Sequence, residues 1–510
     1  METFPSHPVL SLDGAKRFEA DLFGGNEAKE WPAMRRAGTA IAGAVLDDYR
    51  ELNRFRQNAH VLVLVGKGHN GGDALLAAQT ILARHPEARA DVWLVFGERS
   101  LRPLAARAYR ELVHSAPKRI RIVSRINALP ETYDLSIDGV FGFQFRPPLT
   151  PKITTLFSQL NRHPIRFRAA VDLPSGLGDA DALRADFTYA TGSVKTPVLD
   201  EAMRSVVGRL RYLDLGFFSG DSNAERALPS APQMDSADRV LTTDALAPLR
   251  VLRPAVSDKR SYGHVFILGG SRSYPGAVLM SALAAARSGA GLITAFVPES
   301  LVPAYAAQAP EIIWVGWPET PNGGLALEGT HLLRERIERA NALLIGPGIA
   351  REPETLALLA DTVKTATVPL VIDADALQPD IVRAGSSPRI LTPHAGEFAR
   401  IAGSASLLDF SRATKVITVL KGPVTRISDG VAVYHSLHGG PVLARGGSGD
   451  ILAGLIAGLL AQKPNEPLAT ACRGVVWHGS GADLLARANG QTAVQTLDRR
   501  CFGCHRLHVK

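Results

Sequence analysis

Two glycine-rich stretches carry an acidic residue just where a helix is expected to begin. The stretch GKGHNGGDA covers residues 66–74 and contains Asn70 and Asp73, and the stretch ARGGSGDIL covers residues 444–452 and contains Asp450. Backbone N–H groups in such a loop, at the first turn of a helix, can bind the phosphates of a nucleotide. A carboxylate beside a phosphate is unfavourable unless it accepts a proton or interacts with the helix dipole. Both stretches therefore predict sites for phosphate-bearing ligands.

The first stretch also has the spacing of a dinucleotide fingerprint. Gly66, Gly68 and Gly71 fit G-x-G-x-x-G between an apolar strand and a helical pattern, which is typical of proteins that bind an intact nicotinamide cofactor. A carboxylate at Asp73 would repel the pyrophosphate of that cofactor. As an acid at the start of a helix, Asp73 would also be favourable without any ligand.

Two further acids follow apolar strands in the same half of the chain. Asp138 precedes the loop GVFGFQFR, and Asp172 precedes LPSG, which contains Ser175. Together with the Asn70 amide, these oxygens could hold a hard cation. They could equally cap helices and turns.

The second half contains its own polar strand ends. Lys421 follows a strand and could neutralise phosphates, and His394 could contact a ligand or simply complete a turn. Asp373 and Asp375 lie two residues apart, which would place them on the same face of a strand. There they could bind Mg²⁺ through water or cap the next helix.

The elements needed to position these residues are strands that alternate with helices. Apolar strand patterns include 60–66, 90–97, 134–142 and 166–176 in the first half, and a second alternating series begins near 263. Such alternation predicts mainly parallel sheets covered by helices on both faces. Between the two series, residues 217–239 are rich in Ser, Ala, Pro and Asp. We predict an α/β domain over 1–217, a linker over 218–239 and a second α/β domain over 240–510.

Composition limits the partners and the compartment. The 510 residues carry a formal net charge of +8, but the basic residues are scattered, which argues against a nucleic-acid groove. No apolar run approaches the ~20 residues that span a bilayer, and the run 451–461 fits a buried helix whose Gly454 and Gly458 allow close packing.

Three cysteines predict a reducing, cytoplasmic setting. The tail CFGCH matches C-x-x-C-H, but the N-terminus has no export signal, so haem attachment is not expected.

The first half resembles the YjeF N-terminal domain family, the NAD(P)H-hydrate epimerases, which has a Rossmann-like three-layer α/β/α fold. The resemblance rests on MRRAG (34–38), GKGHNGGDA (66–74), DGVFGFQFR (138–146) and VDLPSGL (171–177), in the family's order. It implies that Asn70, Asp138 and Ser175 bind K⁺ and that Asp172 is the acid/base group. It also implies that the hydrated nicotinamide nucleotide is surrounded by Asp172 together with His69, Asn70, Gly71, Gly72, Asp73, Gly142, Phe143, Gln144, Phe145, Arg146, Pro147 and Pro148.

Several residues depart from this family's pattern. His69 stands where the family has Asn, Ala74 where it has Gly, and Phe143 and Phe145 interrupt a loop that is normally Gly-Thr-Gly-Leu. A bulky Phe imposes a steric cost where backbone approaches phosphate. One alternative is therefore that the first half binds the nucleotide but has lost catalysis.

The second half resembles the NAD(P)H-hydrate dehydratases of the ribokinase-like superfamily. Its matching segments are YGHVFILGGS (262–271), GPGIA (346–350), DADAL (373–377), LTPHAGE (391–397), LKGPVT (420–425) and GGSGDILAG (446–454). The resemblance implies that Asp450 accepts the proton of the C6 hydroxyl during phosphoryl transfer. It implies substrate contacts from Ala277, Gly348 and His394, and ADP contacts from Lys421, Gly422, Pro423, Val424, Thr425 and Gly449.

Together the two resemblances predict one bifunctional repair enzyme. It would interconvert the R- and S-hydrates of NADH and NADPH and dehydrate the S-form with ADP, giving AMP and phosphate. We expect K⁺ at the first site and Mg²⁺ with ADP at the second, small-molecule substrates, no nucleic-acid or membrane partner, and a homo-oligomer. The alternatives are a dehydratase with a degenerate first half, or a small-molecule kinase that releases a phosphorylated product.

Overall fold

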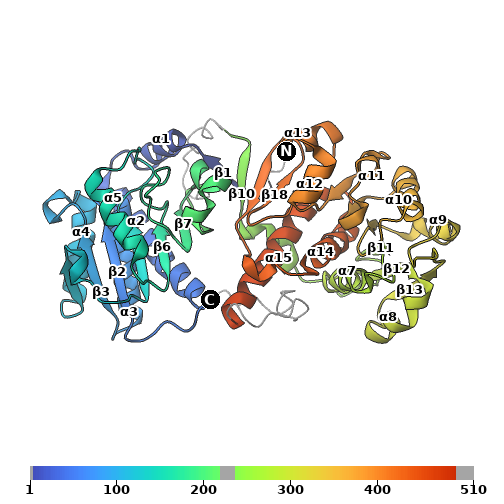
Figure 1. Ribbon diagram of the computed structural model, residues 1–510, viewed down its shortest axis with the longest axis horizontal. Helices are drawn as coiled ribbons and strands as arrows, with labels where there is room; N and C mark the ends of the chain where they lie inside the picture. Colours follow the sequence, from blue (N-terminus) through green and yellow to red (C-terminus); the bar gives the residue numbers. More distant parts are fainter. Residues whose placement is uncertain (1–3, 219–235, 490–510) are drawn as a thin grey trace. The chain divides into compact units, whose positions relative to one another are not determined.

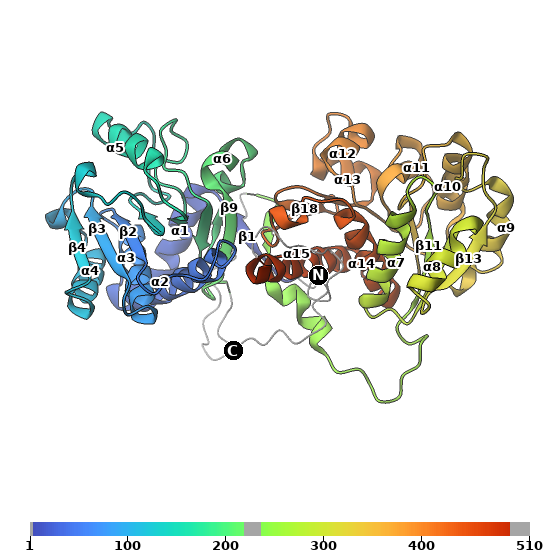
Figure 2. The same ribbon diagram turned by 60° about the horizontal axis from the view of Figure 1, so that its bottom comes forward.

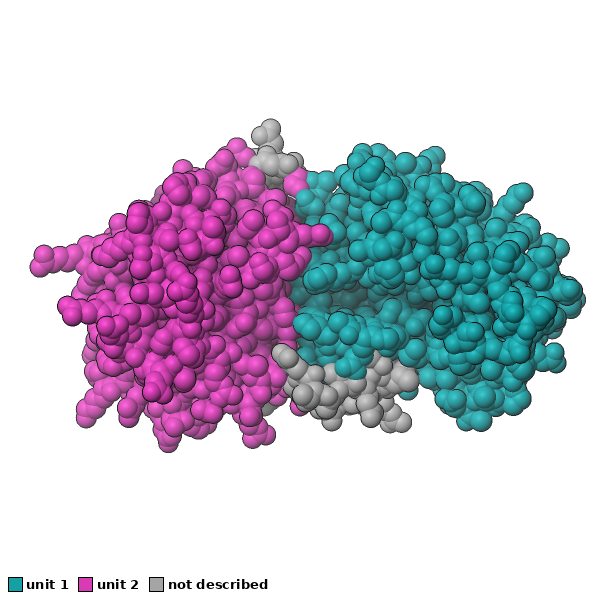
Figure 3. Space-filling view, viewed as in Figure 1, with its two compact units in different colours: residues 1–6, 237–486, 492–510 teal, residues 7–236, 487–491 magenta. Residues whose placement is uncertain are grey.

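The alternation of strands and helices builds two separate parallel sheets. The computed structural model describes residues 4–218 and 236–489 (Figure 1). Contacts group residues 7–218, 236 and 487–489 into one unit, magenta in Figure 3, which we call the first unit because it holds the first half of the chain. Residues 4–6 and 237–486 form the other unit, teal in Figure 3, which we call the second unit. Most of the predicted linker and the Cys501–Cys504 tail lie outside the described residues.

The first unit contains a seven-stranded sheet in the order β4-β3-β2-β5-β6-β7-β9, with every neighbouring pair parallel. Its strands are β2 (His60–Val65), β3 (Arg89–Leu94), β4 (Ile120–Val123), β5 (Leu135–Gly139), β6 (Arg168–Val171), β7 (Phe187–Thr191) and β9 (Arg209–Leu213). A second small pairing joins β1 (Ser6–Leu10) to β8 (Val194–Lys195). The helices are α1 (Leu12–Phe23), α2 (Glu27–Tyr49), α3 (His69–Arg84), α4 (Pro103–Ser115), α5 (Pro151–Arg162) and α6 (Arg204–Val207).

Alternating side chains of β2 form two cores on the two faces of this sheet. Val61, Val63 and Val65 pack with residues of α2, α3 and α4, whereas Leu62 and Leu64 pack with residues of α5. Figure 2 shows α5 on one side of the sheet and α2, α3 and α4 on the other. This arrangement confirms the predicted three-layer α/β/α fold.

The second unit has a larger, mainly parallel sheet in the order β13-β12-β11-β14-β15-β16-β17-β18-β19-β10, in which β18 is antiparallel to β17 and β19. Its strands are β10 (Asp238–Leu241), β11 (His264–Leu268), β12 (Leu292–Pro298), β13 (Ile313–Trp317), β14 (Ala342–Ile345), β15 (Leu370–Ile372), β16 (Arg389–Leu391), β17 (Ile417–Leu420), β18 (Thr425–Ser428) and β19 (Val433–Ser436).

Helices cover both faces of this second sheet. Its apolar side chains form one core with α7, α8, α14 and α15, and another with α10 to α13. The helices are α7 (Pro275–Arg287), α8 (Val302–Gln308), α9 (Thr330–Arg334), α10 (Pro353–Thr365), α11 (Pro379–Arg383), α12 (Ala395–Ala402), α13 (Leu407–Thr414), α14 (Ser448–Gln462) and α15 (Pro467–Asn489). Among the described helices, none is both long and apolar enough to cross a membrane.

Close packing of α14 on α7 positions the second glycine-rich stretch. A Cβ added at Gly454 would lie 2.1 Å from the Ser281 carbonyl oxygen, and one at Gly458 would lie 2.1 Å from Ser288 Oγ. Residues 451–461 of α14 are all buried. The predicted buried helix with a close glycine contact is therefore confirmed, and it fixes the start of α14 against the sheet.

We expect Gly454→Ala to destabilise the second unit by about 1–3 kcal/mol, because the added methyl overpacks the α7–α14 contact. Gly276→Ala, in the first turn of α7, is the matched control, since a Cβ there meets nothing within 4 Å. Scanning calorimetry would compare the transition midpoints. Equal midpoints for Gly454→Ala and Gly276→Ala would contradict the packing argument.

Candidate functional sites

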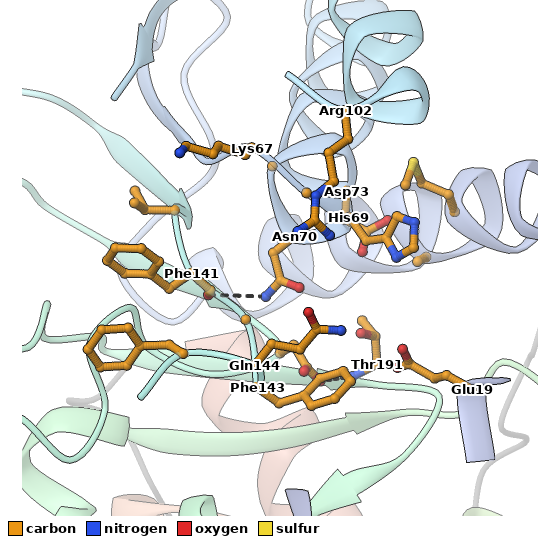
Figure 4. A pocket seen from close by; sticks show the side chains of 18 of the residues that line it. Glu19, Lys67, His69, Asn70, Asp73, Arg102, Phe141, Phe143, Gln144 and Thr191 are labelled. Atoms are coloured by element: carbon orange, nitrogen blue, oxygen red, sulfur yellow. Dashed lines mark hydrogen bonds between the residues drawn. The ribbon is translucent and has the colours of Figure 1, made fainter. Parts of the chain in front are cut away.

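The carboxyl ends of neighbouring parallel strands bring the first set of predicted residues to one sheet edge. Strands β2, β5, β6 and β7 are consecutive in the sheet. They lead into the Gly66 loop, the 140–148 loop, Asp172 and Gly192, respectively. A pocket of about 590 Å³ opens there, lined by residues of α1, α2, α3 and these loops (Figure 4). This edge is where open α/β sheets place their ligands.

Asp138 and Ser175 form a buried hydrogen-bonded pair, and the Phe141 carbonyl oxygen links this pair to Asn70. Ser175 Oγ donates to Asp138 Oδ1 at 2.6 Å, and the Ser175 N–H donates to Asp138 Oδ2 at 2.8 Å. Asn70 Nδ2 donates to the carbonyl oxygens of Phe141 and Val171 at 3.3 and 3.0 Å. Burial raises the pKa of Asp138 to about 6, while the Ser175 hydrogen bonds lower it. Asp138 is thus a buried carboxyl group whose hydrogen bonds come only from neutral donors. Such a group, close to other oxygen atoms, is suited to bind a cation.

Asp172 is held by a buried lysine. Lys195 Nζ lies 2.6 Å from Asp172 Oδ1, and the two side chains are 1% and 5% exposed. The Thr191 N–H also donates to this Oδ1, at 3.4 Å. The backbone of Asp172 has φ +64°, a conformation uncommon for residues other than glycine, Asn and Asp. The ion pair therefore holds the Asp172 carboxyl group in place at the pocket wall.

Asp73 lines the same pocket without being a helix-start acid. It is the fifth residue of α3, whose N-cap is Gly68, so the interpretation of Asp73 as an N-terminal acid is wrong. The side chain is 9% exposed, and Oδ1 meets no hydrogen-bond partner among the described residues. Burial raises the pKa of Asp73 well above its ordinary value, and the charges of Asp172 and Glu19 raise it further.

Three residues that depart from the family's pattern, His69, Phe143 and Phe145, line the pocket of the first unit without filling it. Phe143 lies with its ring centroid 5.5 Å from Lys195 Nζ, and Phe145 stacks on Phe141 with 4.8 Å between ring centroids. His69 Nε2 lies 3.2 Å from Glu30 Oε2. The phenylalanine side chains of this loop, which were expected to impose a steric cost, do not close the pocket.

Most of the residues predicted around the nucleotide do line this pocket, but Gly72 and Pro147 do not. A Cβ at Gly72 would lie 2.8 Å from Met34 Sδ, so Gly72 serves helix packing. Sequence reasoning missed Lys195 and Glu19. Lys195 ends the short strand β8, which follows the buried strand β7, and this position is only a weak sequence signal for a buried charge. Glu19 lies in the amphipathic helix α1, whose sequence gives no signal for a residue in the pocket.

The second site is organised around Lys421. Lys421 Nζ lies 3.0 Å from Asp373 Oδ1, which also accepts a hydrogen bond from Thr392 Oγ1 at 2.8 Å. A Cβ added at Gly449 would lie 3.1 Å from this ammonium, so the start of α14 runs directly beside it. A cation next to the backbone N–H groups of a helix start can bind phosphate.

Carboxylates near Lys421 have shifted pKa values. Burial raises the pKa of Asp450 to about 6; the charge of Asp373 raises it and that of Lys421 lowers it. Burial likewise raises the pKa of Glu397. Burial opposes the charge on Lys421, but Asp373 and Glu397 raise its pKa above the ordinary value. A carboxyl group with its pKa raised in this way can accept a proton close to neutral pH.

The predicted substrate contacts of the second half lie at the same sheet edge. Gly348 follows β14 with φ +68°, and a Cβ there would lie 2.9 Å from Ala277 Cβ, so these two residues are neighbours. His394 follows β16 and forms the N-cap of α12: its Nδ1 accepts from the Gly396 and Glu397 N–H groups. The His394 ring is thus a helix cap whose exposed edge stays accessible, at 62% side-chain exposure.

Asp373 and Asp375 do not share a strand face. Strand β15 ends at Ile372, and the two acids flank Ala374, whose φ is +54°. Asp373 pairs with Lys421, whereas Asp375 pairs with Arg351 at 2.6 Å. The prediction of a common face is wrong because the backbone turns immediately after the strand.

The segment predicted to hold ADP follows Lys421 directly. Gly422 and Pro423 are exposed, Val424 is buried, and Thr425 begins β18. A Cβ at Gly422 would meet only the Val424 carbonyl oxygen, at 3.6 Å. This turn therefore leaves open space beside the lysine.

Comparison with known proteins matches both halves. A family model described as YjeF-related protein N-terminus matches residues 32–196, and one described as NAD(P)H-hydrate dehydratase matches residues 265–501. A Bifunctional NAD(P)H-hydrate repair enzyme Nnr from Gloeobacter violaceus is 35% identical over 501 residues, with 92% of each chain covered. The chain belongs to this family of bifunctional NAD(P)H-hydrate repair enzymes.

Other relatives of this repair-enzyme family span most of the chain. The enzyme of the same name from Thermosynechococcus vestitus is 36% identical over 450 residues, with 84% of each chain covered. Among solved structures, an ADP/ATP-dependent NAD(P)H-hydrate dehydratase from Bacillus subtilis, co-crystallised with ATP and Mg²⁺, is 28% identical. That match covers 48% of this chain and 88% of that one, with a TM-score of 0.42.

We expect Lys195→Met to lower the free energy of unfolding of the first unit by about 3–5 kcal/mol, because it leaves the Asp172 carboxylate buried without its cation. The double variant Lys195→Met/Asp172→Asn leaves no buried charge and should regain most of that loss. Calorimetric midpoints of the two variants test this. Equal destabilisation of both would show that the ion pair does not set the stability.

Proposed function

We propose that this chain is a bifunctional enzyme that epimerises NAD(P)H hydrates in its first unit and dehydrates the S-form in its second. Membership of the repair-enzyme family supports both activities. The observation that carries the second activity is the position of Asp450, a base with a raised pKa at the glycine-rich start of α14, next to Lys421.

In the proposed dehydratase reaction, ADP phosphates bind along the first turn of α14 and Lys421. Asp450 accepts the proton of the C6 hydroxyl as that oxygen takes the β-phosphoryl group, leaving AMP. Loss of phosphate from C6 and of a proton from C5 then restores the ring double bond. Lys421 lies where it can neutralise charge on the transferred group. Gly348, Ala277 and the exposed edge of His394 would position the hydrated ring.

At this site Mg²⁺ would bind mainly to the phosphates of ADP and less to protein side chains. Among the described residues, no three metal-ligating side chains converge, and Asp373 is already paired with Lys421. Mg²⁺ commonly keeps several waters and binds substrate phosphates with one or two carboxylates. The ion would supply charge neutralisation for phosphoryl transfer.

In the first unit we propose that Asn70, Asp138 and Ser175 hold K⁺ near the substrate, with Asp172 as an acid/base group. The oxygen cluster and the absence of a basic partner for Asp138 among the described side chains support this assignment. The pocket remains open despite Phe143, which favours an active epimerase over a degenerate binding domain. The low cysteine count supports a cytoplasmic setting, and a homo-oligomer stays a prediction.

We expect recovery of NADH from mixed NADHX epimers to require ADP and Mg²⁺ and to fall about 10²–10⁴-fold in Asp450→Asn, because the proton acceptor is lost. Since the pKa of Asp450 is raised to about 6, the carboxylate is available above that pH and is lost as pH falls through it. The wild-type rate should therefore drop below about pH 6, and that acidic limb should be missing from the residual rate of Asp450→Asn. NADH absorbance follows recovery.

The product analysis separates the competing functions. Release of AMP and phosphate with NADH supports the dehydratase, whereas accumulation of a phosphorylated hydrate would indicate a kinase. Recovery of NADH without any nucleotide would contradict the mechanism.

Replacing K⁺ by Li⁺ should slow interconversion of the NADHX epimers but leave ADP-dependent dehydration of the S-form unchanged, because the oxygen cluster lies only in the first unit. Ser175→Ala should raise the K⁺ concentration needed for half-maximal epimerisation. Chromatography of the two epimers measures both effects. An epimerisation rate independent of the monovalent ion would exclude the proposed K⁺ site.

A further inference from the structure

Epimerisation at C6 needs proton transfer at both faces of the ring. The C6 hydroxyl must leave as water from one face, and a new water must add from the other face. The first step needs an acid near the leaving oxygen, and the second needs a base near the attacking water. Asp172, paired with Lys195 at 2.6 Å, supplies only one of these groups.

The pocket presents a second carboxyl from the opposite wall. In Figure 4, Asp73 lies with His69 and Asn70 on one side of the pocket, while Thr191, Phe143 and Gln144 lie on the other. Asp172 belongs to the Thr191 side, because it accepts the Thr191 N–H. Asp73 and Asp172 therefore face the pocket from α3 and from the end of β6, respectively.

The surroundings of Asp73 suit a proton donor. Oδ1 is buried and lacks a partner among the described residues, so the side chain has hydrogen-bonding capacity that a ligand could use. No salt bridge from Asp73 to a described basic side chain is formed, since Lys195 is engaged with Asp172. Asp172 and Glu19 both oppose a negative charge on Asp73. A carboxyl placed this way is stable in its protonated form.

We propose that Asp73 is the catalytic acid that works with Asp172 as base, so that the epimerase uses one carboxyl on each face of the ring. This proposal rests on the proposed epimerase function. Asp73 gives its proton to the C6 oxygen, the C6–O bond breaks, water leaves, and the N1 lone pair forms an N1=C6 double bond.

The second half of the reaction reverses these bond changes on the other face. Water attacks C6, the N1=C6 π electrons return to N1, and the proton of the attacking water passes to Asp172. No oxidant or reductant is needed, and one water leaves for each water that adds. The proton has moved from Asp73 to Asp172, so conversion of the opposite epimer, or exchange with solvent past Glu19, restores the starting state.

Glu19 gives the proposal a measurable pH signature. Burial raises the pKa of Glu19 to about 7, and its charge raises the pKa of Asp73. The charged groups that line the pocket around Asp73 are Glu19 from α1, Glu30 from α2, His69 from α3, Asp172 after β6, Lys195 from β8, and Lys67, Arg102 and Arg146 from the loops. Epimerisation should decline at high pH as Asp73 loses its proton, and Glu19→Gln should move this alkaline limb to lower pH.

The test uses the full chain without nucleotide, following conversion of pure S-NADHX into the R-form by chromatography. Asp73→Asn preserves shape and neutrality but cannot donate a transferable proton. We expect its kcat to fall at least about 10²-fold with little change in KM, and its alkaline limb to disappear. Addition of ADP then measures dehydration in the same preparation, and calorimetry checks that the first unit is folded.

Matched variants keep the proposal falsifiable. Glu30→Gln removes another pocket carboxylate, one that faces His69, and should leave the position of the alkaline limb unchanged. If Asp73→Asn epimerises within threefold of wild type, or keeps the alkaline limb, the proposal is overturned while the epimerase function stands. If Asp73→Asn is unfolded, an unmoved limb in Glu19→Gln overturns it. If the wild-type chain does not interconvert the epimers, the proposed epimerase function itself fails.

Discussion

Both sites depend on one geometric constraint, that neighbouring parallel strands end at the same edge of a sheet. In the first unit this brings together loops that are far apart in the sequence, from Asn70 to Asp172 and Thr191. In the second unit it places the end of β15, with Asp373, and the end of β17, with Lys421, at one edge. Helix α14 then lays its first turn beside that edge. Without parallel pairing, none of these residues would meet.

Each unit has a lysine–aspartate pair beside further carboxyl groups, fully buried in the first unit and partly exposed at Lys421 in the second. Lys195 pairs with Asp172 at 2.6 Å, and Lys421 pairs with Asp373 at 3.0 Å. Because each ammonium is already engaged, the next carboxyl in the site is only partly compensated and its pKa rises by burial. A raised pKa makes such a group a better proton donor or acceptor than an ordinary carboxylate.

The sequence predicted the fold class and the strand ends that carry the sites, because alternating apolar segments and glycine loops are local signals. It could not reveal which polar groups pair with one another. Lys195 and Glu19 lie outside any glycine motif, so their place in the pocket follows only from tertiary packing. The error at Asp375 has the same origin: the strand ends at Ile372, before both acids, and they turn to different partners. Asp73 looked like a helix-start acid only because the start of α3 could not be located within a run of glycines.

Helix α7 links two tasks in the second unit. It carries Ala277 near the predicted substrate position, and Ser281 Oγ donates to the Asp450 carbonyl oxygen at 2.9 Å while packing against Gly454. The helix that carries a predicted substrate contact thus also holds the backbone at the start of α14, where the predicted base Asp450 lies. A substitution that moves α7 is therefore expected to shift the start of α14 as well. The predicted contact at Ala277 and the predicted base at Asp450 would then change together.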